Sequence, residues 1–84
     1  MKILRMESVK AATGHKSHAS IYNAIRDGLF TQPVPIGSRA VGWPDYEVNA
    51  LCQARVAGWS NVAIRDLVKN LHQKREQIEV LQGL

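Results

Sequence analysis

The sequence has little of what marks several protein classes. It contains one cysteine, Cys52, so no internal disulfide can form, and we expect a reducing, cytoplasmic compartment. It has no apolar run long enough to span a membrane. An acidic residue, Glu7, follows the first six residues, so the N-terminus lacks the apolar segment of a signal peptide. It also shows no Ser-His-Asp pattern and no glycine-rich phosphate loop. We therefore expect no enzyme activity, no cofactor and no membrane partner.

Metal ligands are also scarce. His15, His18 and Cys52 are the candidates, but their spacing is loose and no fourth ligand is evident. Cys52 is better interpreted as a small, partly buried apolar residue. We expect no metal site.

Positive charge, by contrast, is in surplus. The 84 residues carry 11 Lys and Arg against 7 Asp and Glu, which gives a net charge of +4 with neutral histidines. A hydrophobic share of 45% is that of a globular protein, and this length allows one modest core. The surplus suits a polyanionic partner, although many small basic proteins bind no nucleic acid.

A helix, a tight turn and a second helix are predicted between residues 7 and 30. The first helix begins at Glu7 or Ser8 and ends at Gly14, where glycine reaches the left-handed conformation without steric cost. Ser17 is the expected cap of the second helix, which must end by Gly28. Such a pair is typical of a helix-turn-helix that reads the DNA major groove, or of a plain helical hairpin in a small bundle.

A two-stranded hairpin is predicted next, because two prolines exclude a helix interior. Residues 34–36 and 41–43 alternate as extended strands around a turn at residues 37–40, with Arg39 at its tip. A hairpin directly after a recognition helix is a wing, whose arginine can enter the minor groove or hold a phosphate. We also expect a short strand at Ile3 or Leu4, and Trp43 as the anchor of the hairpin.

Two more helices follow. The third takes Pro44 as its first helical residue and ends at Gly58, with an apolar face that Val56 extends. The fourth runs from about Val62 to the mid-seventies. Its apolar stripe consists of Ile64, Leu67, Val68, Leu71, Ile78 and Leu81. This stripe either completes the monomer core or pairs with a second copy, and we favour pairing because a small reader has little specificity alone.

Residues 13–22, 28–30, 33–37 and 39–48 together resemble the AlpA family of small phage and prophage regulators. The most specific part is the run Arg39-Ala40-Val41-Gly42-Trp43-Pro44. The resemblance implies a mainly α fold with a small β-hairpin, a winged helix-turn-helix similar to those of MerR proteins and excisionases, plus a C-terminal helix. The segment between Gly14 and Ile21 is one residue longer than the usual family turn. We expect a winged domain over residues 1–57 and a helical extension over residues 58–84.

The implied function is DNA binding near an integrated element, prophage or genomic island. The protein would regulate transcription of an integrase, act as a recombination directionality factor (excisionase), or do both. Expected partners are double-stranded DNA and either the integrase or further copies, in a homodimer or a cooperative assembly. The rival hypothesis is a protein-interaction module that binds an acidic phage or host partner.

Candidate DNA-binding residues lie on the second helix and on the wing. Each could instead be solvated surface, Arg26 could simply complement the helix dipole, and Tyr22 could pack against the first helix. The candidates are Lys16, Ser17, His18, Ser20, Tyr22, Asn23, Arg26, Ser38 and Arg39.

Overall fold

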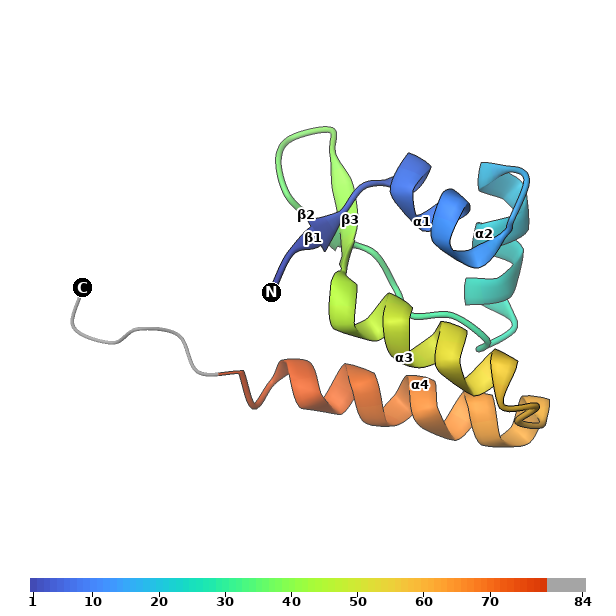
Figure 1. Ribbon diagram of the computed structural model, residues 1–84. Helices are drawn as coiled ribbons and strands as arrows, with labels where there is room; N and C mark the ends of the chain where they lie inside the picture. Colours follow the sequence, from blue (N-terminus) through green and yellow to red (C-terminus); the bar gives the residue numbers. More distant parts are fainter. Residues whose placement is uncertain (79–84) are drawn as a thin grey trace.

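A computed structural model describes residues 1–78 and is mainly helical, with a small antiparallel sheet (Figure 1). The predicted fold class, a winged helix-turn-helix with a further helix, is confirmed. In chain order the elements are β1 (Ile3–Leu4), α1 (Met6–Thr13), α2 (His18–Arg26), β2 (Val34–Pro35), β3 (Val41–Pro44), α3 (Asp45–Val56) and α4 (Asn61–Arg75).

Local signals set the end of α1 and both ends of α2 as predicted, whereas α1 begins at Met6, one residue before the predicted start. Gly14 has φ 80°, and its N–H donates to the Lys10 carbonyl at 2.9 Å. The Ser17 hydroxyl accepts a hydrogen bond from the Ser20 N–H at 3.1 Å and caps α2. Gly28, with φ 79°, turns the chain after α2. The helix-turn-helix is therefore specified mostly by residues within the motif itself.

The sheet has the order β1-β3-β2 with antiparallel pairing throughout. β2 and β3 form the predicted hairpin, which we call the wing, and the Ile36 N–H donates to the Ala40 carbonyl at 2.9 Å across its turn. Pro44 differs from the prediction. It still pairs with Ile3 in the sheet and occupies the N-cap of α3, because the chain remains extended until Asp45.

The core lies between the helices and the sheet. Trp43 is fully buried, its indole N–H donates to the Thr31 carbonyl at 2.8 Å, and its ring lies 6.0 Å from that of Phe30. The expected anchor of the hairpin is thus confirmed. Val56 is 90% exposed and does not extend the apolar face of α3 as expected, because the helix ends there. The buried apolar residues are Val9, Ile21, Phe30, Trp43, Val48, Leu51, Ala54, Ile64, Val68 and Leu71.

The apolar residues of the predicted α4 stripe do not all lie in the core. Ile64, Val68 and Leu71 are buried in this core, whereas Ile78 lies after the helix and is exposed. Leu81 falls outside the described residues. Pairing of α4 with a second copy stays a prediction, as does the domain boundary at residue 57.

The last turn of α4 makes hydrogen bonds to α3 and to residues 31–33. We call residues 31–33 the strap, because they join the end of the helix-turn-helix to the wing. Glu47 is fully buried, and Arg75 donates to its two carboxylate oxygens at 2.6 and 2.7 Å. Arg75 also donates to the Gln32 carbonyl at 2.7 Å, and the Gln32 N–H donates to His72 Nε2 at 3.0 Å. Since a buried charge is tolerated when it is paired, Arg75 makes the burial of Glu47 possible.

Candidate nucleic-acid interface

The predicted recognition helix presents a polar outer face. Ile21 is buried beneath α2, while Tyr22, Asn23 and Arg26 are exposed on the other side. Lys16 is exposed just before the helix. The side facing away from the core is therefore polar and carries basic groups at both ends, as a helix that enters a DNA groove requires.

One group of candidates meets the wing. His18 and Tyr22, one turn apart on α2, line a groove of about 330 Å³ together with Arg39 from the wing tip. Arg5, which precedes α1, lines the same groove. Arg5 is not among the candidate residues from the sequence. The available signal was the expected strand at residues 3–4, since pairing of that strand with the hairpin places the next residue beside the wing.

A carboxylate also stands at this groove. Glu7 lies 3.2 Å from the Lys10 ammonium and 3.4 Å from His18 Nε2, and these hydrogen bonds lower the pKa of Glu7. The carboxylate therefore stays ionised and contacts one basic side chain on α1 and the histidine that begins α2.

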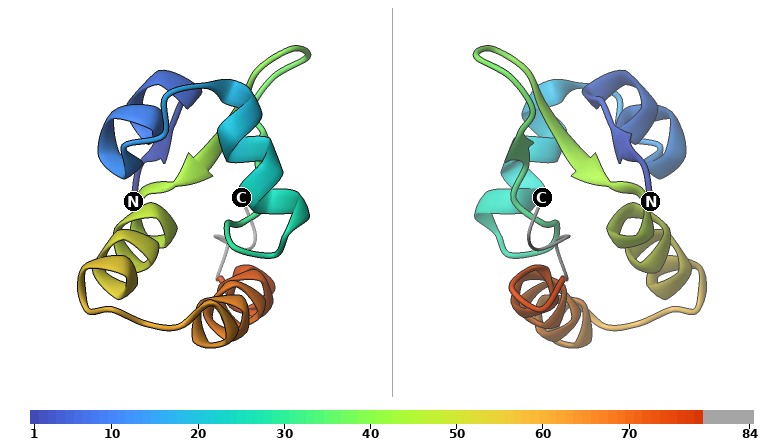
Figure 2. Two further views of the ribbon diagram at one scale, coloured as in Figure 1. Left: turned by 90° about the vertical axis from the view of Figure 1, so that its right-hand side faces the viewer. Right: turned by 90° about the vertical axis from the view of Figure 1, so that its left-hand side faces the viewer.

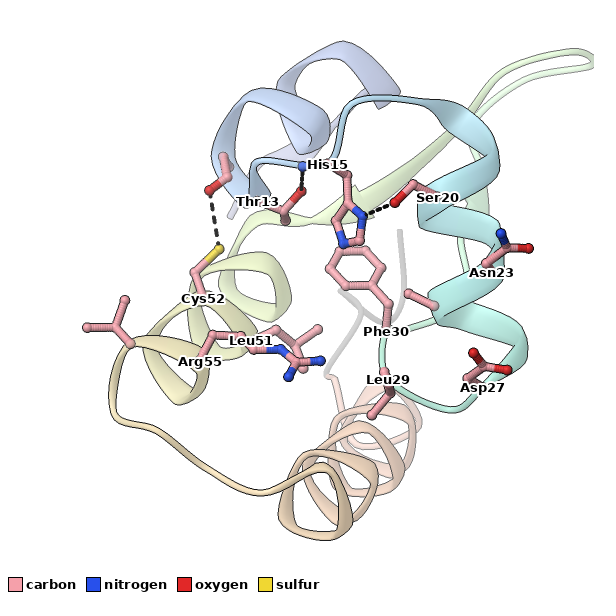
Figure 3. Close-up of a pocket in the computed structure, with 13 residues that line it drawn as sticks. Thr13, His15, Ser20, Asn23, Asp27, Leu29, Phe30, Leu51, Cys52 and Arg55 are labelled. Atoms are coloured by element: carbon pink, nitrogen blue, oxygen red, sulfur yellow. Dashed lines mark hydrogen bonds between the residues drawn. The ribbon is translucent and has the colours of Figure 1, made fainter.

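Ser17 and Ser20 have internal roles. Ser17 is the α2 cap, and the Ser20 hydroxyl hydrogen-bonds His15 Nδ1, which fastens the turn between α1 and α2 (Figure 3). Ser20 faces a cleft of about 580 Å³ between α2 and α3, away from the wing. The structure therefore does not bring these two hydroxyls to the groove of His18 and Arg39.

Asn23 and Arg26 occupy the middle and the end of α2. Asn23 is exposed at the rim of the larger cleft (Figure 3). The Arg26 side chain is 71% exposed and lies 3.4 Å from Asp27 Oδ1. Neither side chain is buried, so both remain available to a ligand that covers the outer face.

The wing carries Ser38 and Arg39 at its exposed tip. Its base is held closely, because a Cβ on Gly42 would lie 2.5 Å from Ile3 Cγ2 and 2.9 Å from the Leu4 carbonyl. Gly42 thus allows β1 to pack against the wing. Figure 2 (left) shows the wing, α2 and α4 following one another along one side of the molecule.

The candidate metal ligands have other contacts. His15 bonds Ser20, and the Cys52 thiol donates to the Ala12 carbonyl at 3.5 Å. In the described part of the chain, no three side chains of metal-binding type are grouped so that they could hold an ion. Within residues 1–78, no helix has both the length and the apolar character needed to cross a membrane.

Comparison with known proteins identifies a family. No curated protein and no solved structure matches the chain. The sequence model of the family described as "Prophage CP4-57 regulatory protein (AlpA)" matches residues 2–56, which run from the lead-in to β1 to the last residue of α3. The match covers well over half of the chain and includes the helix-turn-helix and the wing. The chain belongs to the AlpA family of phage regulatory proteins.

Proposed function

We propose that the protein is a DNA-binding regulator of a phage or integrated element. In this proposal α2 lies in the major groove and Arg39 grips the adjacent minor groove or backbone. The observation that carries the proposal is the groove in which His18 and Tyr22 of α2 meet Arg39 of the wing, with Arg5 beside them. A net charge of +4 would add salt-dependent attraction to the phosphates.

The biological role that we infer is regulation of an integrase gene, recombination directionality, or both. In the first role the protein positions or excludes polymerase at a promoter. In the second role several copies bend DNA so that the integrase assembles an excisive complex. A promoter-reporter assay and an excision assay with purified integrase separate the two roles.

A mobility-shift titration on the DNA that flanks the protein's own gene tests DNA binding. Discrete shifts that resist competitor DNA are expected, and their number reports how many copies assemble. Failure to bind at about 0.1 M salt, where phosphate contacts still hold, would contradict the proposal and favour an acidic protein partner.

A matched pair of variants tests the wing. Arg39→Ala should lower the affinity and reduce the slope of log affinity against log salt by about 1, because one phosphate contact is lost. Lys74→Ala removes the same charge at a lysine that does not line the groove and whose ammonium lies 5.4 Å from the Tyr46 ring centre. Equal effects of the two substitutions would reduce the role of Arg39 to net charge.

A further inference from the structure

We propose that α4 supplies a second grip on the DNA backbone, through Arg65 and Lys69, at the opposite end of α2 from the wing. This inference rests on the proposed function and adds a contact surface outside the family-matched residues 2–56. Its partner is the phosphate backbone that flanks the major groove.

Arg65 is held at the end of the recognition helix. Its Nε donates to the Asp27 carbonyl at 2.9 Å, and its Cγ lies 3.5 Å from the position that a Cβ on Gly28 would take. The side chain therefore lies across the turn that ends α2. Among the described residues, the other guanidinium N–H groups of Arg65 have no hydrogen-bond partner. They remain available to a phosphate, and the Asp27 contact fixes their position in advance.

Lys69 continues the same edge of α4. Residues four apart on a helix are neighbours, so Lys69 stands one turn beyond Arg65. Both are exposed and line a cleft of about 260 Å³ between α4 and the end of the helix-turn-helix, together with Ile25 and Gly28. His72 lies further along this edge and anchors it, because it accepts the Gln32 N–H of the strap.

The acidic groups nearby do not cancel this charge. Asp27 lies 3.4 Å from Arg26 through its carboxylate and offers Arg65 its backbone carbonyl. Asp66 follows Arg65 but lies about 100° further round the helix. Neither carboxylate is bonded to Arg65 or Lys69 among the residues that the structure describes.

The placement of the two grips matches the shape of a DNA groove. Arg39 stands by His18 and Tyr22 in the first half of α2, and Arg65 stands by Asp27 and Gly28 beyond its last turn. The wing, α2 and α4 lie along one side of the molecule in Figure 2 (left). A helix in the major groove is flanked by two phosphate backbones, so cations at its two ends can hold one backbone each.

Fluorescence anisotropy over a salt series tests this surface, with a labelled duplex taken from the DNA that flanks the protein's own gene. Lys69→Ala should lower the affinity roughly three- to tenfold at 0.1 M salt and reduce the salt slope by about 1. Lys69→Glu should lower the affinity further. Lys74→Ala, on the same helix but over the Tyr46 ring, is the matched control. Identical affinity and slope for Lys69→Ala and Lys74→Ala would overturn the inference.

Arg65→Ala is a second test with its own check. This substitution also removes the hydrogen bond to the Asp27 carbonyl and could destabilise the fold. The melting temperature of the variant should therefore be measured alongside its DNA affinity. Lys69 has no hydrogen bond within the described residues, so Lys69→Ala remains decisive if Arg65→Ala proves unstable.

The outcomes separate this inference from the proposed function. Suppose that the wild type binds DNA, that Arg39→Ala weakens this binding and that the α4 variants do not. This result would support the proposed function and contradict the second grip. Absence of binding by the wild type would remove both. If both grips exist, the losses of binding free energy caused by Arg39→Ala and Lys69→Ala should add in the double variant, because the two side chains contact separate phosphates.

Discussion

At the scale of single residues, Gly42 shows how closely the base of the wing is packed. Its φ is not positive, so the requirement for glycine comes from space alone. The missing side chain leaves room for Ile3 and the Leu4 carbonyl, which belong to β1 on the neighbouring edge of the sheet.

Gly42→Ala should therefore lower the free energy of unfolding by about 1–3 kcal/mol through overpacking. Urea unfolding followed by circular dichroism measures the change. Gly37→Ala in the same hairpin is the control, because its Cβ would meet only Ala40 Cβ at 4.0 Å. Equal losses in the two variants would show that flexibility of the hairpin, rather than space, sets the requirement.

His72 gives the fold a dependence on pH. Burial, together with the nearby Arg75 guanidinium, lowers the pKa of His72 below its ordinary value of 6.5. The folded protein thus binds the proton less tightly than the unfolded chain. The stabilising effect of neutral His72 is present above pH 6.5 and is lost as the pH falls through 6.5 toward the lowered folded pKa.

His72→Gln should flatten this dependence, because glutamine keeps an acceptor for the Gln32 N–H but does not titrate. The measurement is the midpoint of urea unfolding at pH values from about 8 down to about 5.5, a range chosen to span the ordinary histidine pKa. Wild type should lose stability more steeply than the variant below pH 6.5. Parallel curves would assign the pH dependence to another group.

At the scale of secondary-structure elements, α4 is part of the core. Ile64 is fully buried, whereas Val62 on the same helix is 68% exposed. Ile64→Ala should lower the free energy of unfolding by about 2–5 kcal/mol, because it leaves a cavity among the buried residues. Val62→Ala should change it by no more than about 0.5 kcal/mol. Thermal unfolding compares the pair. A small effect at Ile64 would mean that α4 is only loosely attached to the helix-turn-helix.

Elements could be predicted from the sequence where local chemistry determines them. Gly14 and Ser17 set adjacent helix ends through bonds to residues three or four positions away, and such signals are visible in the sequence. The contact between Glu47 and Arg75 spans 28 positions, and that between Gln32 and His72 spans 40. Nothing in the neighbourhood of either partner indicates such a pairing. From its local sequence Glu47 is an ordinary acid in a helical first turn, whereas its burial depends on a residue in another helix.

The candidate site was predictable to a similar degree. The exposed face of α2 and the wing tip follow from periodicity and turn chemistry. The separation of Ser20 from the His18 and Arg39 groove does not, because it depends on the bond between Ser20 and His15 and on the approach of α3. Arg5 reaches the groove because β1 pairs with β3, and the sequence indicates a strand at residues 3–4 but not its partner.

At the scale of the whole molecule, the proposed contacts predict the ionic-strength dependence of DNA binding. The exposed cations in question are Arg26 on α2, Arg39 on the wing, Arg65 and Lys69 on α4, and Arg5 just before α1. Four to five phosphate contacts would give a slope of log affinity against log salt of about −4. Anisotropy titrations over a salt series measure it. A slope near −1 would mean that the protein touches DNA at little more than one phosphate.

The pairing of Glu47 with Arg75 has a consequence for the order in which the chain is made. Synthesis proceeds from the amino terminus, so the helix-turn-helix, the wing and the buried carboxylate leave the ribosome before their counter-ion does. Until residue 75 emerges, Glu47 lacks its ion-pair partner, and the strap lacks two of its hydrogen bonds. A chain cut short within α4 before His72 would carry every family-matched residue and still lack the hydrogen bonds between α4 and the strap. In newly made protein the strap would therefore gain its hydrogen bonds to α4 only at the end of synthesis.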